Sequence, residues 1–120
     1  MSIENNKNIV RNFLEKVWNN AEYDLIPHFI DSNYIVYALG SKVILQGIEG
    51  VLTNVQTVHS SFPQFKITIE DMFGESDRVV SRLTLHTLSN SKEVTKREII
   101  IHRIDGNKIL EAWAIGSNWD

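Results

Sequence analysis

The sequence lacks cysteine altogether, and it has only two prolines among its 120 residues. The absence of cysteine excludes disulfide bonds, thiol nucleophiles and cysteine-based metal sites. No run of lysine and arginine occurs and the formal net charge is −3, so we predict no nucleic-acid partner, because phosphate binding needs a basic face. No apolar stretch approaches the roughly 20 residues of a membrane span, so we predict no membrane partner.

Several motifs are also missing. The four histidines, at positions 28, 59, 86 and 102, lie far apart with no metal-ligand spacing, so we predict no metal site. No nucleophile elbow, phosphate-binding loop or dinucleotide fingerprint occurs, and we expect no cofactor. Residues 1–8 are polar and carry no apolar signal core, which favours a cytoplasmic protein.

What is present is an ordinary globular balance, with 42% hydrophobic and 22% charged residues, in a length that fits one domain, 1–120. Apolar residues recur at helical spacing in three places. They predict a first helix ending at Asn19 and Asn20, a short second helix over 25–30, and a third over 48–62. Pro63 ends the third helix, because the residue before a proline disfavours helical backbone.

The remaining segments are rich in β-branched and aromatic residues or alternate between apolar and polar side chains, which predicts strands. Turn residues separate them, including Gly40-Ser41 and the hairpin signal Asp105-Gly106-Asn107. Three helices followed by long consecutive antiparallel strands predict an α+β fold whose helices cover one face of the sheet. The predicted strands are 34–39, 43–45, 65–73, 79–88, 94–105 and 109–119.

Local strings resemble a known family by their order and spacing. They are FLEKVWN at 13–19, FIDSNY at 29–34, GIEGV at 47–51, FPQF at 62–65, IED at 69–71, DRVVSRLTL at 77–85, RIDGNKI at 103–109 and EAW at 111–113. Together they resemble the SnoaL-like (polyketide cyclase-like) group of the nuclear transport factor 2-like superfamily, over nearly the whole chain. The resemblance implies a cone-like curved antiparallel sheet wrapped around about three N-terminal helices and enclosing one pocket for a small apolar or aromatic ligand. It also implies a homodimer formed through the convex sheet face.

The resemblance implies a catalytic acid on the last strand, about four residues after Trp113. That position holds Ser117, whose hydroxyl cannot act as a base near neutral pH, and the His-Asp pair expected near Val36-Tyr37 is also missing. Two functions therefore stay open. One is a cofactor-free acid/base enzyme, cyclase-like or isomerase-like; the other is a non-catalytic ligand-binding or assembly domain that has lost the acid.

Charged and titratable side chains supply candidates for the site. Arg82 resembles a pocket arginine that would anchor a ligand carboxylate, or it lies at the edge or dimer face of the sheet. His59 and His102 are candidate proton carriers, against half-buried, solvated or interface positions. Glu98 is either a pocket acid or, as we favour, one half of a cross-strand ion pair with Arg82 or a neighbouring lysine. Asp71 keeps the parity of Ile67 and Ile69 and could point inward, although a water-facing position is the safer interpretation.

Aromatic residues supply the expected pocket wall. Trp113 and Tyr37 are the main candidates, because large aromatic faces suit a planar apolar ligand. Trp18 and Tyr34 are further candidates, with core packing favoured for Trp18. Ser117 completes the predicted ligand-binding set through its place in the last strand.

Overall fold

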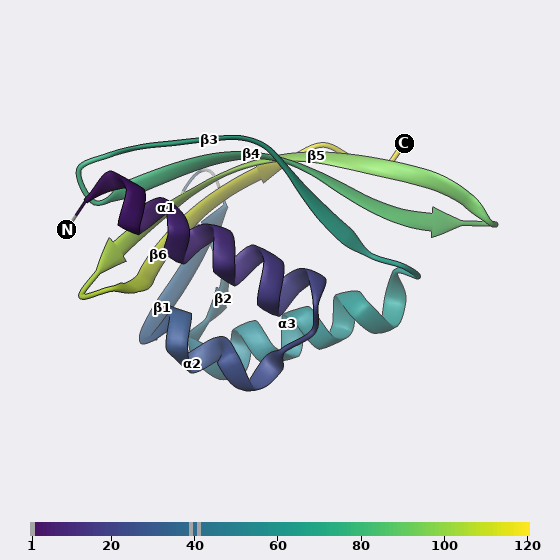
Figure 1. The fold of residues 1–120 in the computed structure, drawn as a ribbon. Coiled ribbons are helices and arrows are strands. Elements are labelled where there is room, and N and C mark those ends of the chain that lie inside the picture. The colour runs from purple at the N-terminus through teal and green to yellow at the C-terminus, as the bar shows by residue number, and fades with distance from the viewer. Residues whose placement is uncertain (1, 39, 41) are drawn as a thin grey trace.

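The helical segments lie against one face of a six-stranded sheet that curves around them (Figure 1). This computed structural model describes residues 2–38, 40 and 42–120, so the predictions for Leu39 and Ser41 lie outside the described residues. The strand order is β2-β1-β6-β5-β4-β3, with β1 and β6 parallel and each other neighbouring pair antiparallel. The α+β fold class, a curved sheet around N-terminal helices, is confirmed.

The strands that form the sheet are β1 (Ile30–Ala38), β2 (Val43–Gln46), β3 (Lys66–Glu75), β4 (Arg78–Ser89), β5 (Lys92–Asp105) and β6 (Lys108–Gly116). The helical segments are α1 (Ile3–Asn12), the π-helix η1 (Phe13–Asn19), the 3₁₀ turn η2 (Tyr23–Leu25), α2 (Ile26–Phe29) and α3 (Gly47–Ser61). The last strand is shorter than predicted, since regular pairing with β5 ends at Gly116. None of the described helices is long and apolar enough to cross a membrane.

The first helix changes its hydrogen-bonding pattern halfway along. Ser2 caps the N-terminus of the α-helical part, and its hydroxyl accepts a hydrogen bond from the Asn5 amide at 2.9 Å. From Phe13 the chain is a π-helix, and the amide of Asn20 donates to the carbonyl of Glu15 five residues back, at 3.0 Å. Periodicity predicted one helix with the correct end, but an apolar stripe alone does not separate the two helix types. Such π segments occur often at functional sites.

The core lies between the helices and the inner face of the sheet. Helical side chains from α1, η1 and α3 meet the inward residues of β3, β4, β5 and β6, and each large aliphatic side chain buried there stabilises the fold by roughly 1.5–3 kcal/mol. The most deeply buried are Val10, Val17, Ile26, Ile30, Val55, Val79, Leu83 and Ile109. This layer leaves the opposite face of the sheet without a covering helix (Figure 1).

A bulge in β3 decides which face each of its residues occupies. Ile69 pairs with the inward-facing Leu83, but Asp71 pairs with Arg82, which lies on the outer face. Glu70 is therefore an extra residue in the strand, and the inside-outside alternation reverses after it. Asp71 is exposed and bonds to Arg82 on the outer face, as the water-facing interpretation expected.

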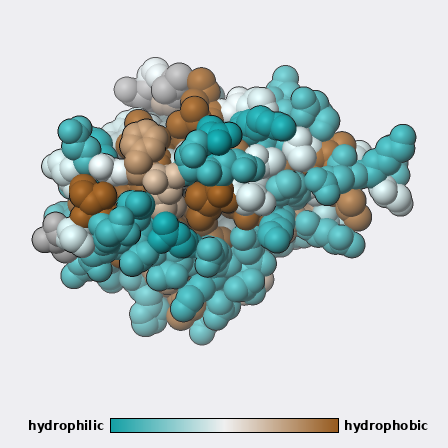
Figure 2. Space-filling model, turned by 45° about the horizontal axis from the view of Figure 1, so that its top comes forward, coloured by the Kyte–Doolittle hydropathy of each residue, from teal (hydrophilic) through white to brown (hydrophobic). Residues whose placement is uncertain are grey.

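The outer face carries a row of apolar side chains that crosses the sheet. The register places Phe73, Val80, Ile101, Trp113 and Tyr37 opposite one another on five successive strands, and Ile99 pairs with Ile115 in the next row. Phe73, Ile99 and Ile115 are 61%, 47% and 52% exposed. Figure 2 shows apolar side chains gathered on this side of the molecule among polar ones.

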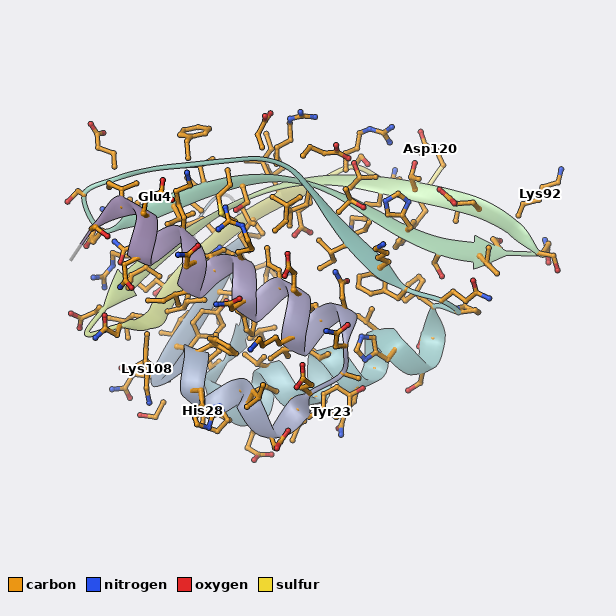
Figure 3. All side chains as sticks on the ribbon, viewed as in Figure 1. Glu4, Tyr23, His28, Lys92, Lys108 and Asp120 are labelled. Carbon is orange, nitrogen blue, oxygen red and sulfur yellow. The ribbon has the colours of Figure 1, made fainter. Side chains whose placement is uncertain are left out.

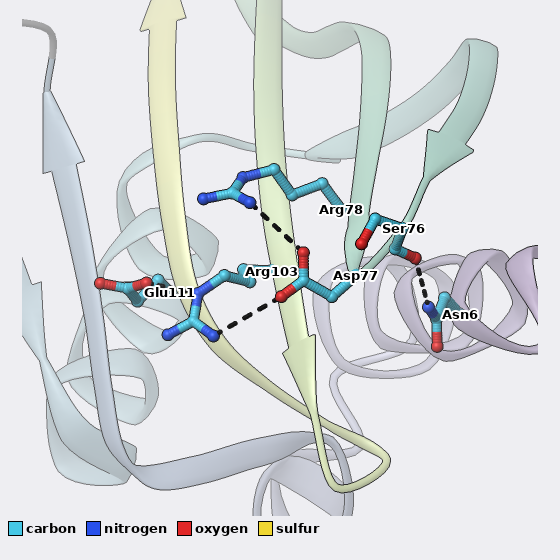
Figure 4. A network of polar contacts seen from close by, with 6 residues as sticks. All are labelled: Asn6, Ser76, Asp77, Arg78, Arg103 and Glu111. Atoms are coloured by element: carbon cyan, nitrogen blue, oxygen red, sulfur yellow. Dashed lines mark hydrogen bonds and ion pairs between the residues drawn. The ribbon is translucent and has the colours of Figure 1, made fainter. Parts of the chain in front are cut away.

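Charged side chains border this apolar row at the end of the sheet that holds the β3–β4 and β5–β6 turns (Figure 4). Asp77 forms ion pairs with Arg78 at 3.3 Å and with Arg103 at 3.7 Å, and Nε of Arg103 donates to Glu111 at 2.6 Å. The guanidinium of Arg78 also lies 5.5 Å from the centre of the Trp113 ring. The pairs fix the orientation of long side chains around the apolar row, and because they are partly exposed each contributes little to stability.

Candidate functional site

An inner pocket of about 260 Å³ lies between the helices and the concave face of the sheet. Figure 3 shows side chains from both layers converging in this region. The lining comes mainly from apolar residues of η1, α3, β4 and the strands beside it, and a cavity of this kind suits a small apolar molecule. Its polar members are Tyr34, Asn54, Lys96, Glu98 and His102.

His102 is buried in the pocket wall, with 1% of its surface exposed. The ring of Phe13 meets it edge-on, with the ring centres 6.4 Å apart. Its Nδ1 atom is buried and has no hydrogen-bond partner among the described residues. Burial lowers the pKa of His102 to about 4, because an apolar surrounding disfavours the charged ring. The imidazole is therefore neutral at pH 7.

Glu98 also faces the pocket, from β5. It pairs with Leu83 on β4, so it lies on the inner face, whereas Arg82 pairs with Ile99 and points outward. Of the ion pairs predicted for Glu98, the one with Arg82 therefore does not form, because neighbouring residues of a strand point to opposite faces. Burial raises the pKa of the Glu98 carboxyl, and the ammonium of Lys96 lowers it by a smaller amount.

Trp18 reaches the pocket from the π-helical segment. Its ring lies 5.8 Å from the ring of Phe65, which also lines the pocket. Because Trp18 is packed in this way, it serves both as part of the core and as part of the pocket wall. The sequence interpretation favoured the first of these roles and kept the second open.

His59 lies beside the pocket but is not part of its lining. Its Nε2 atom is 2.6 Å from the carbonyl oxygen of Trp18, and its Nδ1 atom is 2.6 Å from the hydroxyl of Tyr23. A carbonyl only accepts, so Nε2 carries the proton and Nδ1 accepts from the tyrosine. Both nitrogens are occupied, and His59 connects α3 to the end of η1.

Three predicted ligand-binding residues lie on the outer face of the sheet. Trp113 pairs with Tyr37, and their rings stack with centres 5.9 Å apart. Nε of Arg82 donates to Asp71 at 2.7 Å, and both of these side chains are more than half exposed. The interpretation that put them in the pocket is corrected here, because the registers of β1, β4 and β6 turn all three away from it.

Ser117 lies just beyond β6 and is exposed. Its hydroxyl accepts a hydrogen bond from the amide of Arg97 at 3.0 Å and donates to the carbonyl of Asn118 at 2.9 Å. These backbone bonds occupy the side chain, which is absent from the pocket lining. The structure thus places Ser117 in the segment that follows β6, outside the pocket lining.

The C-terminal segment contributes a pocket residue that the sequence did not suggest. Trp119 stacks on Phe62 at the end of α3, with ring centres 5.2 Å apart, and both rings line the pocket. Asp120 exchanges two backbone hydrogen bonds with Thr95, at 2.9 and 3.0 Å, which hold the segment beside β5. Trp119 had been placed at the end of a strand, where alternation gives no sign of such a contact.

The described residues offer no metal centre, since no three of their His, Asp or Glu side chains come together. What the pocket can supply is a desolvated carboxyl, a neutral imidazole, a tyrosine hydroxyl and one lysine within an apolar wall. Groups of this kind can hold, donate or accept a proton.

Helices enclosed by a curved sheet, with one apolar pocket between them, define a protein of the nuclear transport factor 2-like class. The model of the SnoaL-like polyketide cyclases matches residues 8–118, and the chain belongs to this family. The family and the pocket together support a small-molecule-binding protein. No curated protein sequence matches the chain.

Solved structures of other proteins share the fold. A proposed polyketide cyclase from Bacillus cereus is 26% identical with a TM-score of 0.83, over 95% of this chain and 75% of its own. A proposed polyketide cyclase from Acidithiobacillus ferrooxidans is 22% identical with a TM-score of 0.83, over 98% and 92%. An LEH-like epoxide hydrolase from M. tuberculosis is 14% identical with a TM-score of 0.77, over 96% and 84%. Different reactions thus occur on this fold.

Proposed function

We propose that the protein binds a small apolar or aromatic molecule in the inner pocket and moves a proton on that molecule without a cofactor. The observation that carries this proposal is the neutral, buried His102 in an otherwise apolar wall. A neutral imidazole can accept a proton, and a pocket shielded from water strengthens its interaction with a bound ligand. Trp18 supplies an aromatic surface for the ligand.

A thermal-shift screen against planar apolar ligands tests the pocket, because a ligand that binds only the folded protein raises its melting temperature. Trp18→Ala should abolish or strongly reduce the shift given by such a ligand. Trp113→Ala is the matched control, since it removes the same side chain from the outer face and should leave the shift in place. Loss of the shift in Trp113→Ala alone would contradict the location of the site.

A non-catalytic binding or assembly domain is the second candidate function. Ser117 favours it, because a serine with both polar functions engaged stands where the family resemblance implies an acid. The two candidates differ in what happens to a bound ligand in D₂O. A proton-transfer enzyme should form product or incorporate deuterium into the ligand, and His102→Gln should slow this. A bound ligand that stays unchanged would support the binding domain.

We also infer that two copies associate through the outer face of the sheet. The apolar row across this face is uncovered, and exposed apolar patches of this kind often form protein interfaces. Charged pairs at its border would give the interface its polar rim. For the homodimer we propose the cytoplasm as its location.

A further inference from the structure

Glu98 is the one pocket residue that combines a desolvated carboxyl with the absence of a partner. Among the described residues its carboxylate makes no hydrogen bond and no ion pair, although the side chain lines the pocket. A half-buried acid in an apolar wall is costly to keep charged, so the neutral form is favoured and its O–H can donate. A buried O–H without a hydrogen-bond partner makes the folded protein less stable, and a ligand that accepts a hydrogen bond from it removes this cost.

The surroundings of Glu98 leave it open to the pocket interior. Leu83 lies beside it on β4, and Gly116 lies beside it on β6. A Cβ atom at Gly116 would lie 3.7 Å from the Glu98 carboxylate and 3.0 Å from Cε of Lys96. The glycine therefore provides the space in which these two side chains lie side by side.

Few titratable groups face Glu98. On its own strand these groups are Lys96 and His102. From β1 the group is Tyr34, and burial raises the pKa of its hydroxyl. From α3 the pocket receives the uncharged amide of Asn54, while β4 and β6 present only apolar residues and Gly116. Lys96 is thus the only cation among the described residues that line the pocket, and no ion pair joins it to Glu98.

We propose that Glu98 is the ligand anchor of this pocket, where its neutral carboxyl donates a hydrogen bond to the carbonyl oxygen of an apolar ligand. The inference rests on the proposed function and narrows it to one substrate class, neutral aromatic or apolar ketones. A carboxylate ligand fits less well, because it would lie against Glu98, and the ionised form of Glu98 has no O–H to donate.

Two probes of matched shape test this assignment: 2-acetylnaphthalene, which has the carbonyl, and 2-isopropenylnaphthalene, which replaces its oxygen by CH₂. At the acid end of a pH series, wild-type protein should bind the ketone about tenfold more tightly than the alkene, the value of one good hydrogen bond. The preference should fall as the pH rises, because deprotonation removes the donor. Glu98→Leu should bind both probes alike.

Glu98→Gln is the decisive variant, since its amide keeps a donor but cannot titrate. It should retain the ketone preference and hold it unchanged from pH 5 to pH 9. Lys96→Met should move the loss of preference to higher pH, because the ammonium that lowers the Glu98 pKa is gone. An equal preference in wild type and Glu98→Leu, or a pH dependence that persists in Glu98→Gln, would overturn the anchor alone. Failure of both probes to bind would overturn the proposed pocket ligand and the anchor with it.

Discussion

At the scale of single residues, His102 links the stability of the fold to pH. Its pKa is about 4 in the folded protein, below the ordinary value of 6.5, so the unfolded chain takes up the proton first as the pH falls. The stabilisation is fully present above pH 6.5 and is lost progressively between pH 6.5 and pH 4.

Urea unfolding at pH 7 and pH 4.5 should reveal this link. The wild-type protein should lose about 2 to 3 kcal/mol of unfolding free energy from this group between the two values. His102→Gln should lose correspondingly less, whereas His28→Gln, at an exposed histidine, should behave as wild type. An equal loss in His102→Gln and wild type would show that other groups cause the acid sensitivity.

Side-chain direction was the part of the site that sequence could not supply. In β5 the run Ile99, Ile100 and Ile101 puts apolar residues on both faces, so alternation does not say which of them faces inward. Register decides it, and register depends on β4 and β6. The same ambiguity led Trp113 and Tyr37 to be placed in the pocket and led Glu98 to be assigned to an ion pair.

At the scale of elements, Asn19 joins the π-helix to the sheet. Its side-chain amide donates to the carbonyl of Ile67 at 2.9 Å and accepts from the amide of Ile67 at 2.7 Å. It thus satisfies both backbone groups of one residue on the edge strand β3, where no further strand lies. The sequence marked this asparagine only as a stop signal for the helix.

Asn19→Ala should lower the free energy of unfolding by about 2 kcal/mol, because two hydrogen bonds at a part-buried position are lost. Asn20→Ala is the matched control, since Asn20 is exposed and its side chain makes no hydrogen bond with the described residues. Its effect should stay within about 0.5 kcal/mol. Chemical denaturation compares the two variants, and equal effects would contradict the role given to Asn19.

Most elements could be predicted because their patterns are long and their ends are marked. Pro63 ends α3 within two residues of the predicted position, and Asp105-Gly106-Asn107 marks the β5–β6 hairpin. The bulge at Glu70 carries no such signal, because a regular alternation of Ile67, Ile69 and Asp71 continues straight through it.

At the scale of the whole molecule, the sheet has two apolar faces, and the helices cover only one of them. Ile99→Asp should weaken the proposed dimer, because it puts a charge into the apolar part of the outer face. Sedimentation velocity at micromolar concentration should give a dimer for wild type and a monomer for this variant. Thr53→Asp adds the same charge on the exposed side of α3 and should remain dimeric. A monomeric wild type would contradict the interface.

The bulge in β3 also has a meaning for how this fold diversifies. Glu70 is the extra residue of the bulge, and its carboxylate accepts a hydrogen bond from the Thr84 hydroxyl at 2.7 Å. If evolution deleted this residue, Ile69 would still pair with Leu83 and Asp71 with Arg82, now in unbroken alternation. Related proteins can therefore gain or lose a residue at this position while their pocket residues still face the pocket. Almost any other insertion or deletion within β3 would turn inward-facing residues to the outer face and outer residues to the pocket.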